Sequence, residues 1–177
     1  MKIAYADPPY LGCGHYYPER QEVDHVELLW ELMRDYDCWA LSCSSPSLGS
    51  LLNAAPIKDV QSVRVAAWVK PFASFKPNVN PGYAWEPVIF RTKRERHTRE
   101  QPTVRDWVVA NITLRKGLVG AKPPSFCYWL FELLGCEAND EFDDLYPGTG
   151  IVTKCWRQYQ EQLQQKQTYM TFEMPSH

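Results

Sequence analysis

The stretch "YADPPYLG", residues 5–12, follows the first apolar run of the chain and carries a carboxylate, two prolines and a tyrosine. Proline fixes φ at about −65° and pushes the preceding residue into extended backbone, so the prolines predict the end of a strand over residues 2–6. One interpretation is a turn that only ends this strand. The other is a site made of a fixed acceptor, a rigid support and a stacking face, supplied by Asp7, by Pro8 and Pro9, and by Tyr10.

Strands and helices alternate along the rest of the chain. Short apolar runs bounded by turn residues predict strands, and apolar residues at helical spacing predict helices. This alternation favours an α/β domain with a mostly parallel sheet. The expected strands are 2–6, 38–43, 63–70, 83–91 and one that begins at 141; the expected helices are 23–36, a short one opened by Ser45 or Pro46, 103–112 capped by Thr103, 122–135 ended by Gly135, and 151–165.

Composition sets the class of protein. The 177 residues predict a single domain, and the net charge of −2 gives no general nucleic-acid footprint. Aromatic residues make up 14% of the chain, which serves either a heavy core or faces for stacking bases. Residues 91–99 hold five basic side chains against one acidic side chain, so either a local basic patch or a solvated charged loop is expected there.

The six cysteines form no CxxC pair and read as reduced thiols, several of them buried, in a cytoplasmic protein. Cys13 and His15 lack two further ligands at suitable spacing, so no metal site is predicted. No apolar run approaches the about 18 residues that a membrane span needs, so no membrane partner is expected.

A second informative stretch is "DLYPGTGIV", residues 144–152. A strand, then Gly148-x-Gly150, then a helix lets the backbone approach a nucleotide-like ligand closely, although such a turn alone also serves as a tight bend. No Gly-Lys-Ser/Thr follows, and the third glycine of the dinucleotide fingerprint is absent. A cofactor that needs many phosphate contacts is therefore disfavoured.

Taken together, Asp-Pro-Pro-Tyr at 7–10 and Asp-Leu-Tyr-Pro-Gly-Thr-Gly at 144–150 resemble the amino-methyltransferases that modify exocyclic amines of nucleic-acid bases with S-adenosylmethionine (SAM). The order resembles their permuted branch, in which the catalytic motif comes first and Lys-Pro, here Lys122-Pro123, opens a helix before the cofactor loop. The resemblance covers most of residues 1–157. It is greatest to the compact versions carried by bacteriophages and other prokaryotic elements, for which a role in restriction-modification is an open use.

The resemblance implies a Rossmann-like class I methyltransferase fold with a circularly permuted motif order and helices on both faces of a mostly parallel sheet. One methyltransferase domain is expected over residues 1–165, followed by a tail, 166–177, that is disordered or adds an edge strand. Loops 11–22, 71–82 and 91–103 are the candidate target-recognition elements. Short or relaxed sequence specificity, or help from a second subunit in a homodimer, follows from this small size.

The resemblance also assigns residues. Asp7 and the Pro8 carbonyl would accept the two N–H groups of the target amine, Pro9 would fix the loop, and Tyr10 would stack on the base. Lys122 either meets the methionine carboxylate or is an exposed lysine at a helix start, and Glu86 either lies near the cofactor or packs in an edge strand. The expected cofactor residues are Asp7, Lys122, Asp144, Tyr146 (where Phe is commoner), Pro147, Gly148, Gly150 and, for the ribose, Glu173; the expected substrate residues are Tyr10, Tyr16, Tyr17, Arg91, Lys93, Arg94, Arg96 and Arg99, with Trp85 as either a stacking or a core residue.

The activity that follows is methylation of DNA, at adenine N6 in preference to cytosine N4. RNA as the substrate and a non-catalytic nucleic-acid-binding module with the same fold stay open as alternatives.

Overall fold

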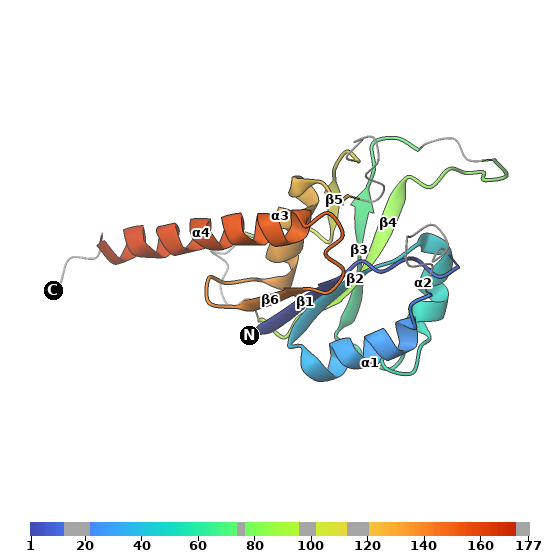
Figure 1. Cartoon of the computed structure of the whole chain (residues 1–177), viewed down its shortest axis with the longest axis horizontal. Helices are drawn as coiled ribbons and strands as arrows, with labels where there is room; N and C mark the ends of the chain where they lie inside the picture. The colour runs from blue at the N-terminus through green and yellow to red at the C-terminus, as the bar shows by residue number, and fades with distance from the viewer. Residues whose placement is uncertain (13–21, 74–76, 96–101, 113–120, 173–177) are drawn as a thin grey trace.

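A computed structural model describes residues 1–12, 22–73, 77–95, 102–112 and 121–172 (Figure 1). Among these residues, no helix combines the length and the apolar character needed to cross a membrane. The strands are β1 (Lys2–Ala6), β2 (Cys38–Ser42), β3 (Val63–Val69), β4 (Trp85–Arg91), β5 (Trp107–Val109) and β6 (Glu141–Asp144); the helices are α1 (His25–Asp35), α2 (Ser45–Leu52), α3 (Pro124–Leu134) and α4 (Ile151–Phe172).

The strands form one six-stranded sheet in the order β5-β3-β4-β2-β1-β6. β1 is parallel to both β2 and β6, and β3 is parallel to β5, whereas β4 is antiparallel to its two neighbours. All strands except β4 therefore point the same way, which confirms the expected mostly parallel sheet. We call the end of the sheet at which these parallel strands finish its carboxyl end.

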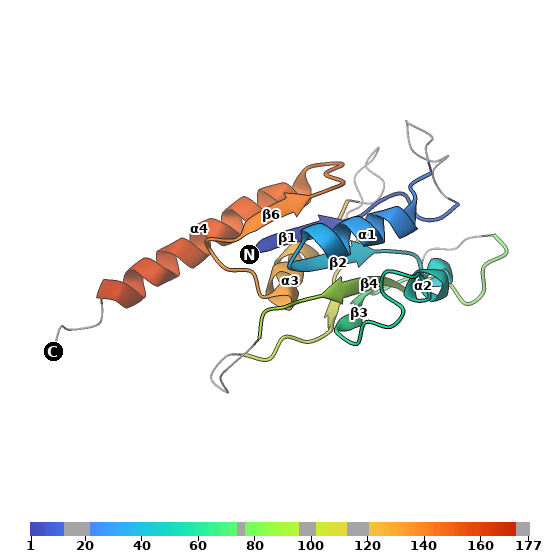
Figure 2. The same cartoon turned by 90° about the horizontal axis from the view of Figure 1, so that it is seen from below.

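Helices cover both faces of the sheet, as expected (Figures 1 and 2). Along β1 the side chains alternate between two cores: Ile3 and Tyr5 enter the core under α3 and α4, while Ala4 and Ala6 enter the core under α1. This alternation is the normal consequence of the strand's period of two. The sheet is thus buried on both sides, and its carboxyl end is where ligands reach it.

Much of the aromatic content serves the core under α3 and α4. Phe131 lies 5.2 Å from the ring of Phe142, 5.4 Å from that of Trp156 and 5.3 Å from that of Tyr159, centroid to centroid. Two of these contacts, those with Phe142 and Trp156, are edge-to-face, the arrangement that the ring quadrupoles favour. Of the two uses open for the aromatic residues, packing accounts for this group.

Two predicted elements were wrong. Residues 103–112 contain the short strand β5 in place of a helix. Trp107 and Val109 are 42% and 51% exposed while Val108 packs against the core, so the pattern has period two and is too short to distinguish from a helical turn by sequence. The second error concerns the end of the last helix, which was expected at residue 165 before a disordered tail or an edge strand. Residues 166–172 instead continue α4, because residues 151–172 contain neither glycine nor proline to stop the helix.

Gly135 ends α3, as predicted, with φ 69° and ψ 37° and its N–H donating to the carbonyl of Glu132. An added Cβ there would lie 3.2 Å from Cδ of Arg94. We expect Gly135→Ala to lower the free energy of unfolding by about 1–2 kcal/mol, because a Cβ is strained in left-handed backbone. The matched control is Gly49→Ala inside α2, where a Cβ meets no atom within 4 Å and the free energy should rise by up to about 1 kcal/mol. Urea denaturation of both variants measures the free energies of unfolding. Equal values for the two variants would contradict a left-handed backbone at Gly135.

Candidate active site

The two informative stretches of the sequence end at the same place. Because β1 and β6 are parallel neighbours, with Tyr5 opposite Asp144, the chain leaves both strands at the carboxyl end of the sheet. The Leu145 N–H donates to the Tyr5 carbonyl at 2.9 Å, which extends the pairing beyond β6. Asp7 therefore lies beside the bend at Gly148 and Gly150.

A buried group of charged side chains surrounds Asp7. Lys122, only 4% exposed, places its Nζ 2.9 Å from Oδ1 of Asp7 and 2.6 Å from Oε1 of Glu86. Glu86 also accepts hydrogen bonds from Lys70 Nζ, at 2.7 Å, and from the Tyr10 hydroxyl. We call these five residues, Asp7, Tyr10, Lys70, Glu86 and Lys122, the carboxylate cluster. It draws side chains from β4 and from the segments after β1 and β3 and before α3.

Electrostatics distinguish the two carboxylates of the cluster. Burial by itself raises the pKa of Glu86, but Lys122 and Lys70 outweigh it and bring that pKa down to about 2. Burial raises the pKa of Asp7, and Lys122 offsets only part of this effect. For Lys122, burial opposes the charged form, but Asp7 and Glu86 raise its pKa above the ordinary lysine value. Glu86 and Lys122 are thus a fixed anion and cation, and Asp7 is the more basic carboxylate.

The bend after β6 leaves a carboxylate oxygen and an open backbone. Asp144 Oδ2 accepts a hydrogen bond from Thr153 Oγ1 at 2.9 Å, whereas its buried Oδ1 has no hydrogen-bond partner among the residues that the structure describes. Gly148 and Gly150 have φ of 46° and 71°, and a Cβ on Gly150 would meet nothing within 4 Å. A buried oxygen without a partner is costly unless a ligand donates to it. The arrangement fits a ligand that has a cationic amine at Asp144 and lies along the backbone of the glycine bend.

The structure gives the burial of several predicted site residues. Pro8 is buried, Pro9 and Tyr10 are half-buried, and Tyr146 is half-buried against the core under α1. Lys122 is not the exposed lysine that was one of its two interpretations, because it is buried between two carboxylates. Glu86 is likewise not in an edge strand, because β4 lies between β2 and β3.

The described basic residues of the run at 91–99, Arg91, Lys93 and Arg94, lie elsewhere. Arg91 ends β4 opposite Trp39 and Val63, at the ends where β2 and β3 begin, and this is the end of the sheet away from Asp7. Lys93 pairs with Asp37 at 3.0 Å, and Arg94 pairs with Asp140 at 2.7 Å. The structure therefore does not bring these three side chains to the carboxylate cluster, and their expected role as substrate residues stays a prediction. The remaining predicted residues, Tyr16, Tyr17, Arg96, Arg99 and Glu173, are outside the described residues.

Sequence reasoning missed Lys70. Its signal was its position directly after the last apolar residue of a predicted strand, since the ends of parallel strands meet. No comparable signal indicated a metal: within the described ranges, no group of three or more His, Cys, Asp or Glu side chains could hold one.

Of the comparisons with known proteins, only the one with solved structures finds matches. No family model and no curated protein matches the chain. Among solved structures, M1.HpyAVI in complex with SAM matches over 89% of this chain and 78% of its own, with a TM-score of 0.59 at 12% identity. M1.HpyAVI alone matches over 89% and 76%, with a TM-score of 0.56 at 13% identity. The chain shares the fold of M1.HpyAVI.

The first of these two structures holds SAM. At this level of identity, the likeness establishes the fold that the two chains share. The expected Rossmann-like class I methyltransferase fold is thereby confirmed. Within that methyltransferase fold, the carboxylate cluster and the glycine bend of this chain lie together at the carboxyl end of the sheet.

Proposed function

We propose that this protein transfers the methyl group of SAM to an exocyclic amine of a DNA base, with adenine N6 as the preferred target. The observation that carries the proposal is the position of Asp7, in Asp-Pro-Pro-Tyr, next to the bend at Gly148 and Gly150. The fold that the chain shares with the SAM complex of M1.HpyAVI supports it.

Asp144 and the glycine bend are the residues that fit the cofactor. When bound, SAM supplies an electrophilic methyl group on a sulfonium. The free Oδ1 of Asp144 would accept from the ammonium of its methionine part, and the glycines would let the backbone approach. Lys122 is committed to Asp7 and Glu86, so its predicted contact with the methionine carboxylate is not part of the proposal.

Asp7 and Pro8 act on the nucleophile. An aromatic amine is a poor nucleophile because its lone pair is delocalised into the ring. Asp7, 21% exposed and held at Oδ1 by Lys122, would accept one N–H, and the Pro8 carbonyl would accept the other. These contacts favour a pyramidal nitrogen and stabilise the positive charge that develops on it during transfer. The proton leaves after the methyl group arrives, so no strong base is required.

Tyr10 is held for stacking on the target base. Its hydroxyl donates to Glu86, which fixes the ring within the carboxylate cluster that contains Asp7. A base must leave a duplex to reach such a site, at a cost of a few kcal/mol. Stacking on an aromatic ring returns about 1–3 kcal/mol per base.

The test combines binding and chemistry. Calorimetric titration with SAM measures cofactor binding, and mass spectrometry of nucleosides after incubation with isotopically labelled SAM identifies the product. We expect labelled N6-methyladenine from duplex DNA. Labelled N4-methylcytosine would mean that the target base is cytosine. A methylated product from RNA alone would mean that the substrate is RNA and not DNA. SAM binding without transfer would favour the non-catalytic module, and no SAM binding by folded protein would refute the proposal.

Asp144→Asn is expected to weaken SAM binding about 10- to 100-fold, because a hydrogen bond between charged groups contributes about 1.5–3 kcal/mol. The matched control is Asp143→Asn, one residue earlier on the same strand, whose Oδ2 accepts from the Tyr36 hydroxyl and whose side chain is 37% exposed. Calorimetry on both variants measures the two dissociation constants. Equal affinities would remove Asp144 from the cofactor site.

A further inference from the structure

Among the described residues from the end of β3 to the start of β4, three large aromatic side chains are exposed. Phe72 is 47% exposed, Tyr83 is 44% exposed, and Trp85, where β4 begins, is 40% exposed. A single exposed aromatic residue needs no explanation, but three so close together in the sequence indicate a surface that contacts something.

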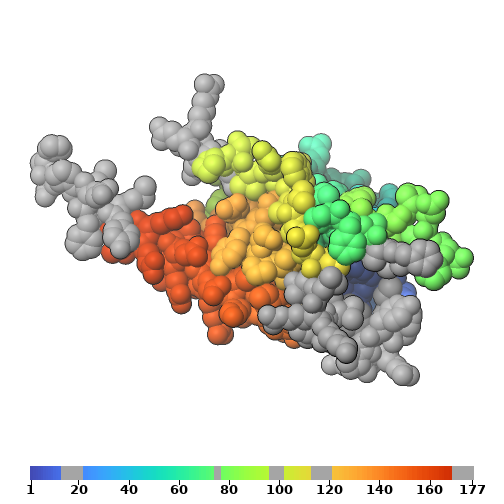
Figure 3. All heavy atoms as spheres, turned by 90° about the horizontal axis from the view of Figure 1, so that it is seen from above, coloured from blue at the N-terminus to red at the C-terminus, as the bar shows by residue number. Residues whose placement is uncertain are grey.

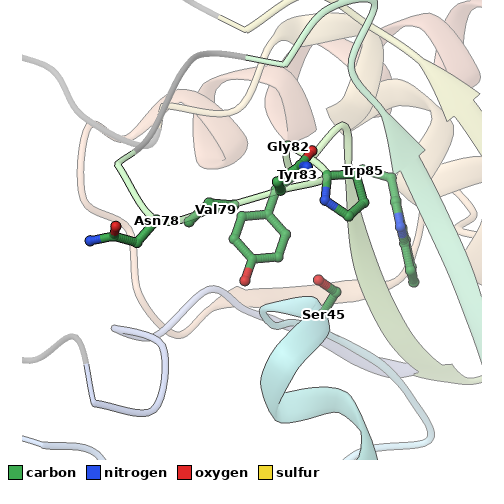
Figure 4. A pocket seen from close by; sticks show the side chains of 8 residues that line it. Ser45, Asn78, Val79, Gly82, Tyr83 and Trp85 are labelled. Atoms are coloured by element: carbon green, nitrogen blue, oxygen red, sulfur yellow. The ribbon is translucent and has the colours of Figure 1, made fainter.

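Two of these rings line a groove. Tyr83 and Trp85 border an open depression of about 420 Å³ together with Ser45 and residues 78–82. Figure 4 shows the side chains of Tyr83 and Trp85 on the side of the depression that faces Ser45, at the start of α2. The volume is within the range of about 300–1,000 Å³ that is typical of sites for small ligands. We call it the aromatic groove.

The aromatic groove and the carboxylate cluster lie at the same end of the sheet. β4 is antiparallel to β2 and β3, so Trp85 and Glu86, the first two residues of β4, lie at the carboxyl end, with their side chains on opposite faces of the strand. Ser45 follows β2, which ends at the same carboxyl end of the sheet as β1. A strand of nucleic acid that brought one base to Asp7 would therefore have its neighbouring nucleotides near this groove.

The chemistry of the lining selects the class of ligand. None of the described residues that line the groove is charged, so it is not suited to hold a phosphate. It offers the aromatic faces of Tyr83 and Trp85, and Asn78 and Asn80 are among the residues that line it. An aromatic face stacks on a base, and an asparagine amide both donates to and accepts from the edge of one. A planar, uncharged group with hydrogen-bonding edges, a nucleobase, matches this lining.

We propose that the aromatic groove binds an unstacked nucleobase of the DNA substrate that neighbours the base under methylation. This inference rests on the proposed function, since it takes the DNA to be positioned by methyl transfer at Asp7. It gives the β3–β4 connection a substrate role that its exposed rings and its position both support. It also adds a stacking contact beyond that of Tyr10.

Photo-crosslinking tests the contact directly. Duplexes that carry 5-iodouracil on either side of the methylated position form covalent bonds with aromatic side chains against which that base stacks. After irradiation of the full chain with SAM and DNA, peptide mass spectrometry should locate the bond at Tyr83 or Trp85. Crosslinks at other residues only, in a protein that methylates the same duplex, would overturn the groove and leave the proposed function intact.

Variants provide the second readout. Trp85→Ala should raise the KM for DNA about 5- to 100-fold, in keeping with the contribution of one stacked base, while the affinity for SAM stays unchanged. Trp85→Phe keeps a stacking face and should recover most of the loss. The control Trp30→Ala removes a ring that is 48% exposed on α1 and should have no effect on KM. An unchanged KM in Trp85→Ala would overturn the inference, whereas absence of methylation by the unaltered chain would count against the proposed function instead.

Discussion

Asp7→Ala is expected to lower kcat for methyl transfer by about 10²- to 10³-fold, the usual cost of removing one group aimed at a developing charge. The variant loses the acceptor that would hold one N–H of the amine and the negative charge that would face the nitrogen as it becomes positive. The contacts of the glycine bend are unaffected, so the dissociation constant for SAM should change little. Initial rates at saturating SAM and DNA measure the effect, and calorimetry measures SAM binding.

Two controls separate chemistry from folding. Lys122 keeps Glu86 as its partner when Asp7 is removed, so the variant should stay folded, which the thermal midpoint checks. Asp7→Asn keeps an acceptor oxygen but lacks the charge, and we expect its kcat between those of Asp7→Ala and the unaltered chain. A kcat that is unchanged in Asp7→Ala would remove Asp7 from the mechanism.

The sequence predicted those features that depend on neighbouring residues. β1 was predicted to end before Asp7 because proline restricts the residue before it, and α3 was predicted to end at Gly135 because glycine adopts left-handed backbone at no cost. The proximity of Asp7 and Asp144 is different, because it depends on which strands pair. The resemblance to a permuted family supplied that information, and periodicity could not have done so.

The contacts within the carboxylate cluster were beyond sequence reasoning. Lys122 and Glu86 are 36 residues apart, and a lysine at a helix start is normally solvated, so nothing local indicated a buried ion pair. The basic run, residues 91–99, shows the same limit of sequence reasoning, because a charge pattern does not reveal its position in the fold. Its charge pattern was evident, but the direction of β4 places Arg91, Lys93 and Arg94 at the end of the sheet away from Asp7, where Lys93 pairs with Asp37 and Arg94 with Asp140.

Lys122→Met is expected to lower the free energy of unfolding by about 3–5 kcal/mol, because it leaves a buried charge uncompensated. The methionine is apolar and can lie next to the rings of Trp68 and Phe126, which the Lys122 ammonium faces at 5.3 Å and 5.7 Å. Glu86 retains Lys70 as a partner, whereas Asp7 loses the ammonium that faces it. Urea denaturation measures the loss.

The matched control is Lys93→Met, which removes a lysine–aspartate pair of similar geometry at the surface, with side chains 48% and 39% exposed. Water screens that pair, so its loss should cost about 0–1 kcal/mol. The double variant Asp7→Asn/Lys122→Met removes the uncompensated charge as well and should recover about 1–3 kcal/mol, the coupling expected of residues in contact. This recovery keeps the test decisive even where Lys122→Met alone is too unstable to purify. Equal losses for Lys122→Met and Lys93→Met, or no recovery in the double variant, would mean that Lys122 does not neutralise Asp7 in solution.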